Sequence, residues 1–315
     1  MDPATSEYVL PYDAAVPAGA VVTSDEIRSP RASNNEFNKG VFTHMTKKSL
    51  LTPLMTLVLV LTAVAAALAI KYGELDGNRH PYVGLMVAYD ENGSRLWRCT
   101  GTLIAPQLFL TAGHCTEDPA DHVEVWFGAD LTNAALNDYP NHGDAGGTPY
   151  THPEYDPNAF FTHDLGVVVL DEPVYMDTYG QLPEEGQFDS LTQRRGLVDS
   201  TFTAVGYGLQ NANKNHLSAL RLRMLARPRL IIMNNAFTGD YSILMSNNAN
   251  SGGTCFGDSG GPLFYGGDES SLLVGVTSYG INSECAGTGG VYRIDRADDL
   301  EWLYGVFGSY LQGYQ

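Results

Sequence analysis

Residues 254–263 read TCFGDSGGPL and place one serine, Ser259, among glycines and close to a cysteine. Glycine permits a tight turn that holds the serine hydroxyl clear of the chain, while neighbouring backbone N–H groups point into the same space. A nucleophile and the donors for a developing oxyanion could therefore come from one loop. Gly-Asp-Ser-Gly alone would be an ordinary turn, but the longer string with Cys255 and Pro262 disfavours that interpretation.

Two further segments supply the groups that a serine nucleophile needs. A serine hydroxyl is barely acidic at neutral pH, so an imidazole must stand beside it as a base. His114 is the candidate, since it follows an apolar run in LTAGHC, residues 110–115. A carboxylate must then hold the imidazole in one tautomer, and Asp164 in FTHDLGVVVL, residues 161–170, is the candidate. An aspartate next to an apolar strand is costly to bury without a partner.

The three segments resemble the chymotrypsin-like (trypsin family) serine proteases, in the family's order and at similar separations. The resemblance covers roughly residue 70 to the C-terminus. It implies catalysis by His114, Asp164 and Ser259, with no cofactor or metal and with polypeptides as substrates. It also implies roles for other positions: oxyanion donors at Gly257 and Ser259, and substrate-binding residues at Gly253, Ser278, Tyr279, Gly280 and Gly290.

The same resemblance suggests specificity and activation. Gly253 would lie at the base of the specificity pocket and carries no charge, so we expect a preference for large apolar or aromatic side chains before the cleaved bond. Asp258 would pair with a freshly cut N-terminal ammonium, and Ile70 is the candidate for that terminus. Residues 67–69 read ALA, which leads to the hypothesis that signal peptidase itself exposes Ile70.

Two other interpretations of the serine loop were weighed. The sequence GDSGG also fits the G-x-S-x-G turn of α/β-hydrolases, in which a histidine follows the serine along the chain. The last histidine here is His216, so that interpretation fails on order. The alternative that stays open is a catalytically silent binding or adhesion module with the same fold.

The four cysteines are even in number in a chain with an export signal, which favours two disulfides. A four-thiolate zinc site is the competing interpretation, although the spacing lacks close C-x-x-C pairs. The protease resemblance implies the pairs Cys99–Cys115 and Cys255–Cys285.

Composition predicts an all-β body. Only 17% of the 315 residues are charged, and 34 glycines and 18 tyrosines favour short strands joined by tight turns. We expect two packed six-stranded antiparallel β-barrels and a C-terminal helix, with a domain boundary in the polar connection near residues 172–192. Apolar runs mark the strands: 83–88, 103–110, 122–127, 165–170, 202–205, 220–225, 230–233, 262–265, 272–278 and 291–294.

The domain organisation follows from these patterns. Residues 50–70 form an apolar run after two lysines and end in small residues, the pattern of a signal peptide, or of a signal anchor if the run is retained. The predicted units are an over-extended or disordered N-terminus at 1–44, the signal at 45–69, barrels at 70–185 and 186–297, and a helix at 298–315. Asp298 or Asp299 would cap that helix.

Charge and export narrow the partners. The net charge is −18 and the basic residues form no cluster, which argues against nucleic acid. We expect a secreted, extracellular monomer, attached to a membrane only if the signal segment is retained.

Overall fold

The computed structural model describes residues 70–315 except 160, 193–200, 214–215 and 236–237. The predicted N-terminal units at 1–44 and 45–69 lie outside the described residues. Within the described residues, no helix is long and apolar enough to cross a membrane.

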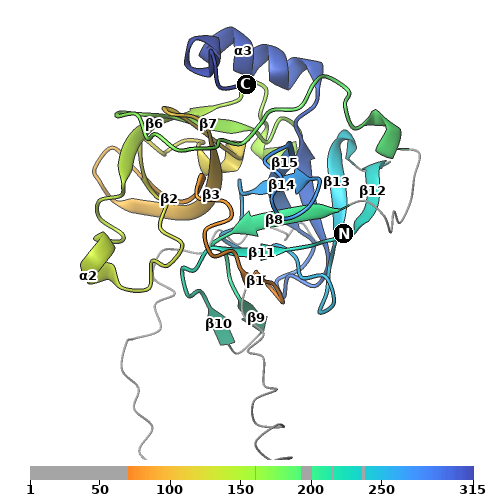
Figure 1. Cartoon of the computed structure of the whole chain (residues 1–315), viewed down its shortest axis with the longest axis horizontal. Coiled ribbons are helices and arrows are strands. Elements are labelled where there is room, and N and C mark those ends of the chain that lie inside the picture. Colours follow the sequence, from red (N-terminus) through yellow and green to blue (C-terminus); the bar gives the residue numbers. More distant parts are fainter. Residues whose placement is uncertain (1–69, 160, 193–200, 214–215, 236–237) are drawn as a thin grey trace, which may run out of the picture. The chain divides into compact units, whose positions relative to one another are not determined.

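The first sheet is a closed barrel of six antiparallel strands in the order β2-β3-β4-β7-β6-β5. All seven residues of β2 are buried, and the apolar faces of the other strands fill the barrel interior. Figure 1 shows this barrel in orange to yellow-green. Its strands are β2 (Val83–Tyr89), β3 (Arg95–Ala105), β4 (Leu108–Thr111), β5 (His122–Trp126), β6 (Ala145–Thr151) and β7 (Gly166–Leu170).

The second sheet has eight antiparallel strands in the order β1-β11-β8-β14-β15-β16-β13-β12 and forms an open, barrel-like half. Strand β1, from the start of the described chain, pairs with the outer edge of β11, so β12 does not close the sheet there. The strands are β1 (Glu74–Leu75), β8 (Phe202–Gly206), β11 (Met224–Ala226), β12 (Leu230–Asn235), β13 (Gly239–Asn247), β14 (Pro262–Tyr265), β15 (Leu273–Gly280) and β16 (Gly287–Arg293); a separate ribbon joins β9 (Asn211–Asn213) to β10 (His216–Ser218).

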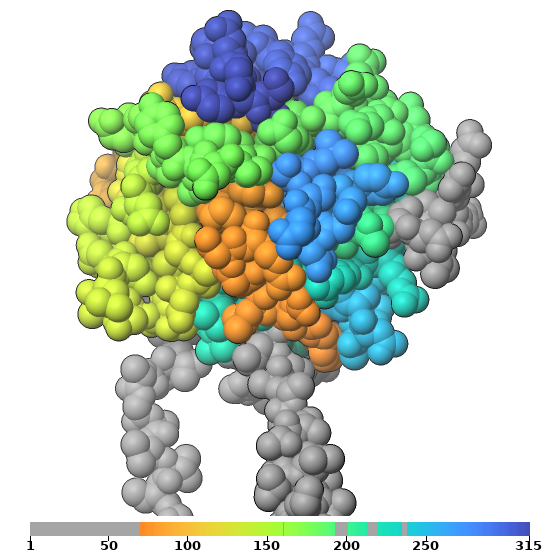
Figure 2. Space-filling view, viewed as in Figure 1, coloured from red at the N-terminus to blue at the C-terminus, as the bar shows by residue number. Residues whose placement is uncertain are grey.

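The predicted all-β, two-barrel class with a C-terminal helix is therefore confirmed, and the departures are local. The apolar run 103–110 is split into β3 and β4, because Pro106 has no N–H for a ladder and a turn forms there. Strand β6 escaped notice because its sequence, AGGTPYT, has no apolar run. Figure 2 shows the orange segment near β1 and β2 lying between the yellow-green barrel and the blue strands of the second sheet.

The C-terminal helix α3 (Ala297–Leu311) lies over the first barrel (Figure 1). Its predicted apolar stripe is buried: Leu300, Leu303, Phe307 and Leu311. The predicted cap is wrong, since the helix begins one residue earlier and Arg296 is the N-cap, without a side-chain cap bond. The two aspartates instead lie in the first turn, where their negative charge interacts favourably with the positive end of the helix dipole.

Candidate active site

The imidazole of His114 and the carboxylate of Asp164 meet at one edge of the first barrel. Thr111 of β4 pairs with Gly166 of β7, so the residues just after β4 and just before β7 leave the barrel together. His114 Nδ1 lies 3.0 Å from each carboxylate oxygen, and the His114 backbone N–H donates to Oδ1 at 3.0 Å. Because a carboxylate only accepts, the ring proton belongs on Nδ1, and Nε2 keeps its lone pair as a base.

A third donor to this carboxylate comes from the second sheet. The hydroxyl of Ser278 in β15 donates to Asp164 Oδ2 at 2.5 Å, and both residues are buried. Sequence reasoning assigned Ser278 to substrate binding and missed this contact. The available signal was a hydroxyl at the end of an apolar strand, which would be costly to bury without an acceptor.

The loop that carries Ser259 is held between the two sheets. The Ser259 carbonyl accepts a hydrogen bond from the N–H of Thr100 in β3 at 2.8 Å. The N–H of Gly260 donates to the carbonyl of Thr277 in β15 at 2.7 Å. Gly260 has a positive φ of 76°, and a Cβ there would lie 2.8 Å from the backbone nitrogen of Ala112, two residues before His114. Only glycine lets the serine loop approach the histidine segment this closely.

Two backbone donors of the serine loop point to no acceptor in the part of the chain that the structure describes. Among the described residues, the N–H groups of Gly257 and Ser259 donate to no acceptor, whereas those of Asp258, Gly260 and Gly261 are all bonded. Gly257 has a positive φ of 92°, and this backbone conformation turns its N–H away from the neighbouring carbonyl groups. The Ser259 hydroxyl likewise makes no hydrogen bond within the described part of the chain. In structures without substrate such catalytic contacts are often long, and they tighten in the complex.

Asp258 is fully buried behind this loop. Its carboxylate accepts the backbone N–H groups of Gly208 at 2.7 Å and Cys255 at 2.9 Å. Burial raises the pKa of Asp258 to about 6, because these bonds offset only part of the lost hydration. It forms no ion pair with the described residues. The fully buried Ile70 packs with Met224 and Ala226.

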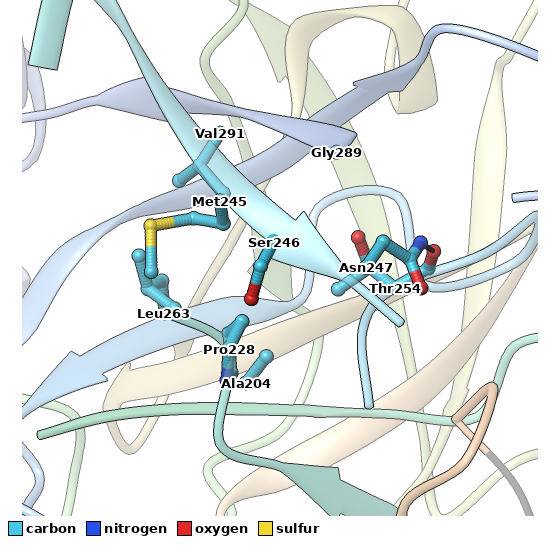
Figure 3. Close-up of a pocket in the computed structure, with 9 residues that line it drawn as sticks. All are labelled: Ala204, Pro228, Met245, Ser246, Asn247, Thr254, Leu263, Gly289 and Val291. Atoms are coloured by element: carbon cyan, nitrogen blue, oxygen red, sulfur yellow. Dashed lines mark hydrogen bonds between the residues drawn. The ribbon is translucent and has the colours of Figure 1, made fainter. Parts of the chain in front are cut away.

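The predicted pocket base lies near a small cavity of about 10 Å³. Figure 3 shows Met245, Leu263 and Val291 on one side of it and Asn247 and Thr254 on the other. Gly253 forms a bridge with Lys71, and the amide group of Asn247 occupies the space that a Cβ on Gly253 would need. Gly253 and Asn247 thus bring no charge to the predicted base, while the side-chain nitrogen of the buried Lys71 bonds to the carbonyl of Glu284.

Gly290, another predicted pocket residue, packs closely against Tyr279. A Cβ on Gly290 would collide with the ring of Tyr279, whose hydroxyl lies 2.7 Å from that of Ser242. Alternation along β16 turns the preceding residue to the other face, and a Cβ on Gly289 would lie 3.1 Å from Thr254 Oγ1. The two glycines therefore lie on opposite faces of β16, and the assignment of Gly290 to the pocket wall stays a prediction.

Both disulfides have the pairing that the resemblance implied, Cys99–Cys115 and Cys255–Cys285. The first joins β3 to the residue after His114, and the second joins the serine loop to the segment after β15. The cysteines are therefore committed to crosslinks, and the zinc alternative is wrong.

A group of metal-ligating side chains lies next to Asp164. It comprises His152, Glu154 and His163. The two imidazoles are stacked, with centroids 4.8 Å apart and planes 10° from parallel, so their in-plane lone pairs do not converge on one ion. Burial lowers the pKa of His152 to about 4, with the nearby His163 as a second cause.

An imidazole–carboxylate pair at the edge of one barrel, facing a glycine-rich serine loop from a second barrel-like sheet, defines the chymotrypsin-like class. The family model described as Trypsin matches residues 76–299. The chain therefore belongs to the trypsin family of serine proteases.

Relatives of the chain carry protease names. It is 32% identical to Brachyurin of Leptuca pugilator, over 60% of this chain and 79% of that protein. It is 29% identical to Chymotrypsin of Phaedon cochleariae (71% and 76%) and 27% to CLIP domain-containing serine protease B15 of Anopheles gambiae (73% and 67%). It spans only 60% of Serine protease 7 of Drosophila melanogaster. These relatives support peptidase function, and hence polypeptide substrates, in general.

Solved structures share the fold. HL collagenase matches with a TM-score of 0.59 at 19% identity, over 76% of this chain and 98% of that one. Human heparin binding protein matches with a TM-score of 0.55 at 20% identity, over 75% and 95%. At these identities the likeness establishes architecture alone.

Proposed function

We propose that the protein is a serine endopeptidase that cleaves peptide bonds through an acyl-enzyme. The observation that carries this is the buried His114–Asp164 pair beside a loop whose N–H groups at Gly257 and Ser259 bond to no described residue. This arrangement supplies a base with a defined tautomer and a site for an oxyanion, which are the costly parts of acyl transfer.

The steps follow from these groups. Ser259 Oγ attacks the carbonyl carbon of the substrate while His114 Nε2 takes the proton of the serine hydroxyl. The resulting oxyanion accepts hydrogen bonds from the two N–H groups. Asp164 stabilises the imidazolium, which then donates its proton to the departing amine as the C–N bond breaks. Water, deprotonated by the same imidazole, hydrolyses the ester and restores the serine.

We further propose that an N-terminal ammonium at Ile70 pairs with Asp258. A buried carboxylate with a raised pKa and no ion-pair partner among the described residues would gain stability from a cation. Ile70 is buried, and Lys71 bonds to Gly253, five residues before Asp258, so the segment already lies near the loop.

The absence of an acidic side chain at Gly253, where the amide of Asn247 is the nearest group, supports a preference for large apolar or aromatic side chains before the cleaved bond, with Gly280 as one wall. The backbone of Ser278, Tyr279 and Gly280 would pair with the substrate as an added strand. Disulfides persist in oxidising compartments outside the cytosol, so the two crosslinks support secretion of the protein. We also propose that the enzyme is a monomer and needs no cofactor.

Active-site labelling tests the proposal. A fluorophosphonate probe should label the wild-type protein and not Ser259→Ala, because only an activated serine reacts. Ser270→Ala is the matched control: its hydroxyl bonds to the Tyr265 carbonyl in the turn before β15, so labelling should persist. A folded, correctly crosslinked wild-type protein that takes no label would instead be the silent binding module.

A further inference from the structure

A positively charged side chain lies against the predicted oxyanion donor. Arg98 stands in β3 next to Cys99 and is half-buried. A Cβ on Gly257 would lie 3.2 Å from its Nη2 and 3.4 Å from its Nε, so the guanidinium covers this glycine. The backbone of Arg98 is held in place relative to the serine loop, because the disulfide from Cys99 and the Thr100–Ser259 bond anchor the same stretch of β3.

Arg98 forms no direct ion pair in the described part of the protein; the one carboxylate whose pKa its charge lowers is that of the buried Asp258. Arg98 also makes no hydrogen bond there, whereas the buried Arg223 bonds to Asp76 and Arg293 bonds to Asp295. Asp258 uses its carboxylate oxygens to accept the N–H groups of Gly208 and Cys255, so the hydrogen-bond donors of Arg98 stay available to a second carboxylate. Holding a half-buried guanidinium unpaired costs free energy that an incoming carboxylate would recover.

The position of β3 decides which part of a substrate meets Arg98. Ser259 is bonded to β3 on one side, through Thr100, and its neighbour Gly260 to β15 on the other, through Thr277. If the acyl half of a peptide lies along β15, as the proposed function requires, the leaving half crosses Ser259 toward β3. An extended peptide advances about 3.3 Å per residue, so its first two residues after the cleaved bond lie within reach of a guanidinium beside Gly257.

We propose that Arg98 selects substrates with an acidic side chain at one of the first two positions after the cleaved bond. The inference rests on the proposed endopeptidase function and names the substrate class of that site. The planar guanidinium pairs with a carboxylate through two parallel hydrogen bonds, and it repels lysine at the same position. The net charge of the protein is −18, which on its own would repel an acidic peptide. The preference for an acidic substrate side chain therefore depends on Arg98.

Internally quenched peptides that differ only at these two positions test the proposal. For wild-type enzyme we expect kcat/KM to be about tenfold higher with Glu than with Lys at the favoured position, a ratio typical of gaining one partly exposed charge pair and avoiding one repulsion. In Arg98→Gln the ratio should fall to about one. Because it compares two substrates on one enzyme, it does not depend on the fraction of active protein.

Arg95→Gln is the matched control, since it removes the same charge from the exposed start of β3 and should keep the wild-type ratio. Equal cleavage of Glu and Lys peptides by wild type, or an unchanged ratio in Arg98→Gln, would overturn the inference alone. Failure of wild type to cleave any peptide or to take the fluorophosphonate label would overturn the proposed function and this inference with it.

Discussion

Replacing Ser278 with alanine should lower kcat about tenfold and leave KM within about twofold, because the lost bond acts on Asp164 and not on substrate. The hydroxyl lies 2.5 Å from a fully buried carboxylate oxygen. A hydrogen bond to a charged group is worth about 1.5–3 kcal/mol. Asp164 keeps two bonds from His114, so we assign about 1.4 kcal/mol of the loss to the transition state, a factor of ten.

The assay is kcat and KM on one peptide substrate across pH, with the active fraction counted by fluorophosphonate titration. Without the Ser278 donor, Asp164 carries more negative charge toward His114, so the acid limb of the kcat/KM profile should move to higher pH. Ser270→Ala again serves as the control. If Ser278→Ala lowered the melting temperature while kcat and the acid limb stayed at wild-type values, Ser278 would be a packing residue only, and this reasoning would be refuted.

Three further predictions concern stability and activation. Leu303→Ala should lower the free energy of unfolding by about 2–4 kcal/mol in a urea titration, since this fully buried side chain packs α3 onto the first barrel core; a loss below 1 kcal/mol would contradict it. Burial raises the pKa of Asp299 to about 8, and Tyr292 donates to it at 2.9 Å. A raised carboxyl pKa stabilises the fold fully below pH 3.8 and loses that contribution as pH rises toward 8, so Asp299→Asn should gain melting temperature relative to wild type between pH 4 and 8, and a constant difference would refute this. Asp258→Asn should reduce kcat/KM by about 100-fold or more if the Ile70 ammonium pairs with it, and N-terminal sequencing of active protein should begin at Ile70; full activity with any other N-terminus would disprove the pairing.

Much of the candidate site was predictable because its chemistry depends on residue types in short motifs. His114, Asp164 and the serine loop were each recognisable from neighbouring glycine, cysteine or apolar residues. The structure brings the first two into contact and places the third between Thr100 and Thr277. The roles in catalysis remain predictions that the labelling experiment tests.

What escaped prediction lies in contacts between segments far apart in the chain. Ser278 and Asp164, which share a hydrogen bond, are 114 residues apart in the sequence, and no local sequence pattern predicts their contact. Which face of β16 Gly289 and Gly290 each occupy depends on the register of this strand with β13 and β15, because successive residues alternate between the two faces. Arg98 drew no attention because a single arginine in a strand is ordinary until Gly257 is known to lie beneath it.

The sequence by itself determined the fold class, the presence of two disulfides and the identity of the candidate reacting groups, because strand content, cysteine count and motif chemistry are local properties of the chain. Tertiary structure alone decided which hydroxyl bonds to Asp164, which face of β16 Gly289 and Gly290 each occupy, and that Arg98 lies beside Gly257. Those depend on strand register and side-chain facing, where a shift of one residue exchanges the two faces of a strand.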